Sequence, residues 1–127
     1  MNLEKVVFAF TIILALTLNF GFFIGDIDNP AHHHPYELYA AIFVNAVATI
    51  LKFGDRSHMG AVLLASSLGA DIQLIAAACV WGYANYVTEL GLAPSTMASI
   101  VSLAGGAVIA NMISVALLSI ETVLLRR

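Results

Sequence analysis

Three polar side chains lie near the centres of long apolar runs, where polar groups are energetically unfavourable. They are Asn45, Asp71 and Asn111. An ionisable group at the centre of a membrane helix costs about 2.5 to 3.5 kcal/mol on insertion scales, so Asp71 needs a partner or an ion. One helical turn away on the same faces lie Ser67, before Asp71, and Ser114, after Asn111. Together these five residues predict an ion pathway at the level of the bilayer midplane.

Two interpretations of Asp71 are open. In the first, its carboxylate joins the Asn and Ser groups in a cation or proton site, on a pathway through a helical bundle or an oligomer of bundles. In the second, Asp71 is protonated and hydrogen-bonded to Asn45 or Asn111 as a structural tie, since polar side chains join membrane helices at about 0.6 to 2 kcal/mol each. Both interpretations turn Asp71 toward protein rather than lipid.

A second group of chemically capable residues follows the first apolar run. Asp28 precedes the consecutive residues His32, His33 and His34, and carboxylates and neutral imidazoles bind zinc, nickel or copper. Their spacing fits no standard metal motif, and Asp28-Asn29-Pro30 is also typical of a turn before a helix. A divalent metal site, a mouth that responds to pH through its histidines, and a solvated turn are therefore alternatives. We expect no other cofactor.

The elements that must position these residues are four apolar runs. About 20 apolar residues cross the roughly 30 Å hydrocarbon core as a helix. The first run lacks a small-residue cleavage site, so we expect it to be retained and not removed as a signal peptide. We therefore predict an all-α, four-transmembrane-helix bundle that forms one domain over 1–127, with spans at about 6–24, 36–53, 59–86 and 97–125.

Composition supports a membrane location. Hydrophobic residues make up 61% of the chain and charged residues only 10%, against about 25% charged in soluble domains. An apolar excess of this size needs lipid to cover it, so we expect the bilayer as a partner. The formal net charge of −3 and the scattered Lys and Arg residues offer no basic surface, so a nucleic-acid partner is not expected.

The basic residues predict the orientation. All of them fall before the first run, between the second and third, or after the fourth, and the positive-inside rule then places both termini in the cytoplasm, an N-in/C-in topology. These residues are Lys5, Lys52, Arg56, Arg126 and Arg127. The two opposite loops contain acidic residues but no Lys or Arg, namely Asp26, Asp28, Glu37 and Glu89.

Small residues recur along the last two runs. Such stripes let helix backbones approach closely, within one chain or between subunits, so they predict helix packing. Because four short helices enclose little interior, we also expect a homo-oligomer with an ion pathway where subunits meet. The predicted packing residues are Ala98, Ser102, Gly106 and Ala110 in the fourth run and Gly69 in the third.

Three segments carry a resemblance to other proteins. They are residues 19–34, the sequence Lys52-Phe53-Gly54-Asp55-Arg56, and residues 67–75, which read SLGADIQLI. With them, most of the chain resembles a group of small, uncharacterised bacterial inner-membrane proteins. The resemblance implies a multi-pass protein of the bacterial cytoplasmic membrane. It implies no activity and no catalytic or binding residue.

Taken together, these features favour a small cation channel or transporter that acts as a homo-oligomer on inorganic cations. The acidic outer loops would attract cations toward its mouth. The alternative is a non-catalytic accessory or assembly subunit, whose polar and small residues bind helices of a larger membrane complex. We do not expect an enzyme, because the sequence shows no arrangement of nucleophile, base and orienting group.

Overall fold

The computed structural model describes residues 3–26, 28–55, 57–88 and 91–125. In these residues all regular structure is helical, and each predicted apolar run becomes one helix whose ends differ from the prediction by at most three residues. The all-α fold class is thus confirmed for the described part of the chain. Four charged residues used above, Arg56, Glu89, Arg126 and Arg127, lie outside it. The elements are α1 (Leu3–Phe23), the 3-10 helix η1 (Pro30–His32), α2 (Pro35–Lys52), α3 (His58–Tyr86) and α4 (Pro94–Leu125).

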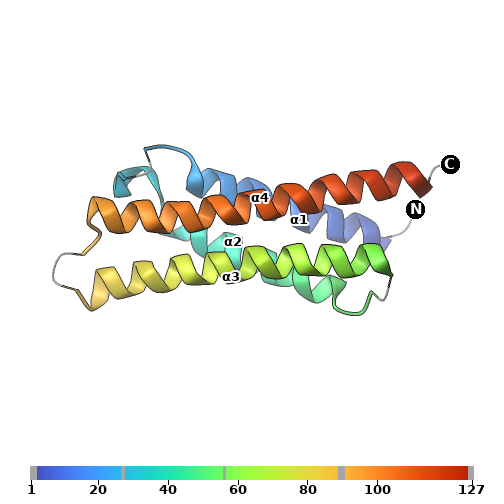
Figure 1. The fold of residues 1–127 in the computed structure, drawn as a ribbon, viewed down its shortest axis with the longest axis horizontal. Helices are drawn as coiled ribbons and strands as arrows, with labels where there is room; N and C mark the ends of the chain where they lie inside the picture. The colour runs from blue at the N-terminus through green and yellow to red at the C-terminus, as the bar shows by residue number, and fades with distance from the viewer. Residues whose placement is uncertain (1–2, 27, 56, 89–90, 126–127) are drawn as a thin grey trace.

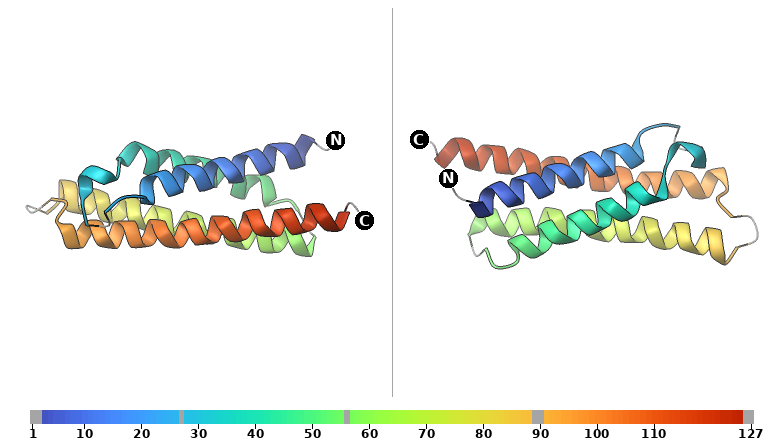
Figure 2. Two further views of the ribbon diagram at one scale, coloured as in Figure 1. Left: turned by 90° about the horizontal axis from the view of Figure 1, so that it is seen from above. Right: turned by 180° about the vertical axis from the view of Figure 1, so that it is seen from behind.

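The four long helices form an antiparallel bundle in which neighbours in sequence are neighbours in space. Each helix packs against the next, and α4 packs back against α1. The start of α1, the end of α4 and the connection from α2 to α3 lie at one end, here called the terminal end (Figure 1). The other two connections lie toward the opposite, loop end, as the views in Figure 2 confirm.

A heptad pattern explains how the helices pack. Buried positions recur at alternating spacings of three and four residues, which keeps one seam of each helix turned toward its neighbours, as in a left-handed four-helix bundle. Helix α3 shows the pattern over almost its whole length. Its buried residues are Gly60, Leu63, Ser67, Ala70, Leu74, Ala77, Trp81 and Ala84.

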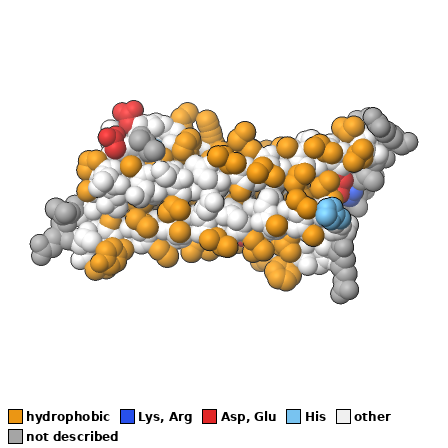
Figure 3. Space-filling model, in the orientation of Figure 1, with side chains coloured by type: hydrophobic (Ala, Val, Ile, Leu, Met, Phe, Trp, Pro, Cys, Tyr) orange, Lys and Arg blue, Asp and Glu red, His pale blue; other side chains and the backbone are white. Residues whose placement is uncertain are grey.

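The outside of the bundle is apolar along its length. In mid-helix, Phe10 of α1 is 67% exposed, Phe43 of α2 71%, Ile72 of α3 66% and Ile109 of α4 61%. Figure 3 shows hydrophobic side chains along the sides of the bundle, with charged groups near its ends. A surface of this kind requires lipid or protein to cover it.

Helix length and composition separate α2 from the other three. Among the described helices, α1, α3 and α4 are long and apolar enough to cross a membrane. Helix α2 has 18 residues and carries Glu37 and Lys52 near its two ends, which lower its mean hydropathy. The structure thus supports a membrane protein with three helices of spanning character.

Candidate functional site

The heptad seam of every helix contains a polar residue in the middle of the bundle. Asn19 of α1, Asn45 of α2, Ser67 of α3 and Asn111 of α4 are each 0% exposed. Ser114 of α4, which the sequence also predicted for the site, is 0% exposed as well. These side chains point into the bundle of their own chain. An interior built from apolar side chains is therefore interrupted by polar groups near its centre.

Contacts between helices fix the relative heights of these groups. The hydroxyls of Ser66 and Ser114 lie 2.5 Å apart across the contact between α3 and α4. Because the two helices are antiparallel, Asn111 then lies level with the turn of α3 that runs from Ser67 to Asp71. The residues predicted for the ion pathway thus share one zone, here called the polar layer: Asn45, Ser67, Asp71, Asn111 and Ser114.

Asp71 lies at the contact between α3 and α2, partly buried, and its partner differs from the one expected. The hydroxyl of Thr49, and not the amide of Asn45 or Asn111, donates to Asp71 Oδ2. The same hydroxyl lies 3.0 Å from the backbone oxygen of Asn45. Since a hydroxyl has one hydrogen, it satisfies only one of these two acceptors at a time. Thr49 shares a helical face with Asn45, which is the sequence signal that could have revealed it.

Several buried atoms of the polar layer, and one of nearby Gln73, have no hydrogen-bond partner in the described protein. An unpartnered buried polar group costs about 1 to 3 kcal/mol, so each one calls for an explanation. Carboxylate, amide and hydroxyl oxygens are also the ligands that hard cations take. The atoms are Oδ1 and Nδ2 of Asn45, Oγ of Ser67, Oδ1 of Asp71, Oε1 of Gln73, and Oδ1 and Nδ2 of Asn111.

Asn19 is the exception among the buried amides. In the orientation that satisfies both of its groups, its nitrogen donates to the backbone oxygen of Ala104 at 3.3 Å and its oxygen accepts from the N–H of Val108 at 3.1 Å. These two backbone groups are one helical turn apart in α4. Unlike Asn45 and Asn111, Asn19 thus has a partner for each of its two amide groups, and both partners belong to the backbone. These two hydrogen bonds tie α1 to α4.

The small residues predicted to pack the helices differ in what surrounds them. A Cβ on Gly106 would collide with the carboxamide of Gln73, so this glycine makes room for the Gln73 side chain between α3 and α4. By contrast, Ser102 is exposed, and a Cβ on Gly69 would meet no atom within 4 Å. Of the predicted packing residues, Gly106 thus supports contact within the chain, Ala98 and Ala110 are half-buried, and Ser102 and Gly69 do not take part in the buried core.

The loop between α1 and α2 is held by a buried histidine. His33 is 1% exposed; its Nδ1 lies 2.5 Å from the backbone oxygen of Phe22, and its Nε2 lies 2.7 Å from that of Asp26. The ring also packs on the side chain of Phe22, with ring centroids 5.6 Å apart. His33 therefore joins the end of α1 to the loop.

The two neighbouring histidines bind other backbone groups. His32 Nδ1 accepts from the N–H of Asp26 at 2.9 Å, and His34 Nδ1 accepts from the N–H of Tyr36 at 3.1 Å, which caps α2. Gly25, with φ +111°, provides the turn that brings this segment back. Within the described ranges, no three His, Cys, Asp or Glu side chains are grouped to hold a metal ion. The structure thus does not bring the predicted ligands His32, His33, His34 and Asp28 together.

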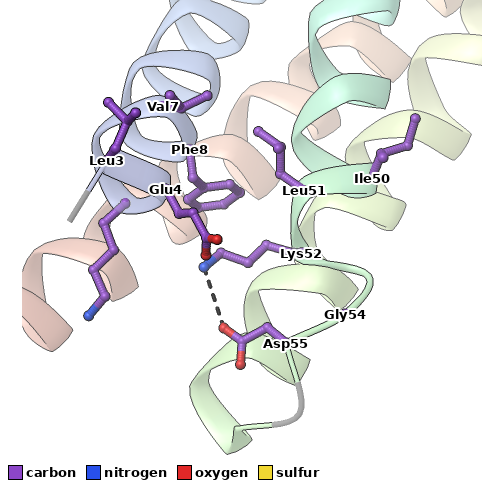
Figure 4. Close-up of a pocket in the computed structure, with 10 residues that line it drawn as sticks. Leu3, Glu4, Val7, Phe8, Ile50, Leu51, Lys52, Gly54 and Asp55 are labelled. Carbon is purple, nitrogen blue, oxygen red and sulfur yellow. Dashed lines mark hydrogen bonds and ion pairs between the residues drawn. The ribbon is translucent and has the colours of Figure 1, made fainter.

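At the terminal end, an open groove of about 910 Å³ lies between α1 and α2. Lys52 crosses it with its Nζ 4.4 Å from the centre of the Phe8 ring and 3.5 Å from the Asp55 carboxylate. Figure 4 shows Glu4 and Lys52 pointing toward each other. The pKa of Asp55 is held below its usual value mainly by hydrogen bonds from the N–H and the hydroxyl of Ser57. The charge of Lys52 lowers this pKa further, and burial opposes the effect. Lys52 and Asp55 thus form an ion pair at the edge of this groove.

Comparison with known proteins gives a family and no further relative. The chain belongs to a family of unknown function, DUF6394, whose model matches residues 32–122. This range includes the whole polar layer, and it confirms the expected likeness to uncharacterised proteins. No curated protein and no solved structure matches the chain.

Proposed function

We propose that this protein is a small cation channel or transporter of the bacterial cytoplasmic membrane, and that its ions pass through the polar layer. The observation that carries the proposal is the set of buried, unpartnered polar atoms on α2, α3 and α4. If the interior bound no ion or water, replacing these polar groups with apolar ones would stabilise the protein. Keeping them near the bilayer midplane is typical of an ion pathway.

The proposal includes α2 as a fourth span. Its 18 residues extend about 27 Å at about 1.5 Å per residue, close to the roughly 30 Å of the hydrocarbon core. Phe43 and Ile50 are 71% and 70% exposed on its outer side, as lipid-facing residues would be. Its polar residues Asn45 and Thr49 are buried inside the bundle. Glu37 and Lys52 near its ends then lie at the height of the headgroups.

Both termini are proposed to lie in the cytoplasm. The described basic residues Lys5, near the start of α1, and Lys52, at the end of α2, belong to the terminal end. The loop end carries Asp26, Asp28 and Glu37 and, among its described residues, no Lys or Arg. The positive-inside rule counts Lys and Arg only, so it places the terminal end in the cytoplasm.

A homo-oligomer remains part of the proposal, but it has a different purpose from the one first expected. The polar layer lies inside the bundle of one chain, so a pathway does not need a subunit interface. Ser102, which is exposed on α4, and Gly69, which has open space beside it, would let a second copy approach closely. Association through these small residues would cover part of the apolar outer surface.

The accessory-subunit alternative is less well supported. It requires the polar residues to bind helices of a partner, whereas Asn45, Ser67 and Asn111 are fully buried within their own chain. We also propose that the protein is not an enzyme, since the polar layer presents amides, hydroxyls and one carboxyl group without a nucleophile and base in contact.

Reconstitution into proteoliposomes tests the proposal. Wild type should conduct or exchange at least one inorganic cation, and Asp71→Asn should reduce the flux by at least about tenfold, because a charge acts strongly in a site of low dielectric. Glu121→Gln is the matched control, since it also removes one carboxylate but lies at the terminal end, 4.0 Å from Lys5. Absence of flux for every cation tested, or equal loss in both variants, would refute a pathway through the polar layer.

A further inference from the structure

The unpartnered atoms of the polar layer are mainly oxygens. Asn45 Oδ1, Ser67 Oγ, Asp71 Oδ1 and Asn111 Oδ1 have no hydrogen-bond partner, and three of these side chains are 0% exposed. Protein oxygens held at the bilayer centre can replace the hydration shell of an ion. The donor set therefore fits a hard cation bound through oxygen.

The charge of this zone decides between classes of cation. Asp71 is the only Asp, Glu, Lys, Arg or His in the central half of any described helix. One monovalent cation beside Asp71 gives a neutral pair. A divalent cation would leave one positive charge uncompensated at the bilayer centre, where an unpaired charge is costly. The balance thus favours a monovalent ion.

A proton alone satisfies this zone less well. It would neutralise Asp71 and resolve the competition of two acceptors for the hydrogen of the Thr49 hydroxyl. However, it would leave the side chains of Asn45, Ser67 and Asn111 without partners. A metal cation neutralises the carboxylate and binds several oxygens at once, so it accounts for more of the observed groups.

We infer that the polar layer binds one monovalent metal cation, Na⁺ or K⁺, inside each chain, with Asp71 as the charged ligand and Asn45, Ser67 and Asn111 as neutral oxygen ligands. This inference rests on the proposed function, to which it gives a substrate class. It also places the site inside a single bundle, because all of these residues come from α2, α3 and α4 of one chain.

Ion-dependent stability of the purified full-length protein tests the inference without any transport assay. Thermal unfolding in detergent can be followed by the fluorescence of Trp81, the chain's only tryptophan, in choline buffer with added NaCl, KCl or CaCl₂. A ligand that binds only the folded state raises the midpoint with the logarithm of its concentration. NaCl or KCl should do so beyond choline chloride of equal ionic strength, and CaCl₂ should not. No rise with either alkali ion, or an equal rise with CaCl₂, overturns the inference.

Two variants and one control assign the site. Asp71→Asn and Asn111→Leu should each weaken the apparent affinity for the alkali ion by at least about tenfold, which is about 1.4 kcal/mol. Asn19→Leu should leave it within about twofold, since the amide of Asn19 is already bound to the backbone of α4. If Asp71→Asn does not fold, Asn111→Leu decides alone. Unchanged affinity in the variants that fold contradicts the assignment.

Binding and flux together separate the inference from the proposed function. Alkali-ion binding without flux in proteoliposomes supports the inference and refutes transport. Proton flux that requires Asp71, with no effect of Na⁺ or K⁺ on stability, overturns the inference and leaves the transport proposal standing.

Discussion

The same substitution at two buried asparagines should change stability in opposite directions. Asn45 and Asn19 both occupy heptad seam positions and are both 0% exposed. The amide of Asn45 has no partner, whereas that of Asn19 has two. Leu has the same number of heavy atoms and the same branching as Asn, so Asn→Leu removes the polar groups with little change of shape. The pair therefore isolates the effect of hydrogen bonding.

The expected magnitudes follow from these partners. Asn45→Leu removes two unpartnered groups that cost about 1 to 3 kcal/mol each in an apolar interior. Chains unfolded within lipid also find partners for polar groups, which lowers the difference, so we expect a gain of about 1 to 3 kcal/mol in total. Asn19→Leu loses two hydrogen bonds at about 0.6 kcal/mol each, so it should cost about 1 kcal/mol. Its two backbone partners, in Ala104 and Val108, keep their bond to each other.

Equilibrium unfolding in mixed micelles with increasing dodecyl sulfate measures both changes. The protein should be held in choline buffer, because an alkali ion in the polar layer would stabilise wild type and reduce the advantage of Asn45→Leu. Asn111→Leu gives a second test, since both amide atoms of Asn111 also lack partners. If Asn45→Leu and Asn111→Leu destabilise the protein as much as Asn19→Leu does, the amides of Asn45 and Asn111 have hydrogen-bond partners in the folded state. That result would refute the prediction.

Three further predictions concern the ends of the bundle. Reporters fused after Arg127 or inserted at 54–57 should read cytoplasmic and an insertion beside His33 should read external; a cytoplasmic His33 would reverse the proposed orientation. His33→Phe should keep the ring's packing but lose the polar contacts of the ring nitrogens with the backbone oxygens of Phe22 and Asp26, so limited proteolysis of the loop between α1 and α2 should speed up. His32→Ala, at an exposed ring, should have a smaller effect. Asp55→Asn should destabilise the start of α3 at neutral pH. The pKa of Asp55 in the folded protein is lowered from 3.8, so its contribution to stability is present above that ordinary value and is lost as the pH falls through the folded pKa. The stabilities of wild type and variant should therefore converge in acid. A difference that persists in acid would contradict this cause.

The sequence by itself determined which segments become helices. Long apolar runs, broken by short segments rich in Gly, Pro and charge, show their character locally, and each of the four became a helix within three residues of its predicted ends. The placement of polar residues near the middle of the runs also followed from counting along the chain. The sequence predicted a membrane span least clearly at α2. Glu37 and Lys52 near its ends lower its mean hydropathy, so composition alone does not show whether it crosses the membrane.

Only the tertiary structure decided which polar groups have partners. Asn19 and Asn45 look alike in sequence, since each is an amide among apolar residues. Asn19 bonds to the backbone of α4, whereas Asn45 has no partner among the described residues. The difference arises because partners depend on the rotation and height of each helix relative to its neighbours. The same reason explains why Thr49, and not an asparagine, donates to Asp71. Helix periodicity is a property of one segment, whereas a hydrogen bond across the bundle requires two segments to meet at one height.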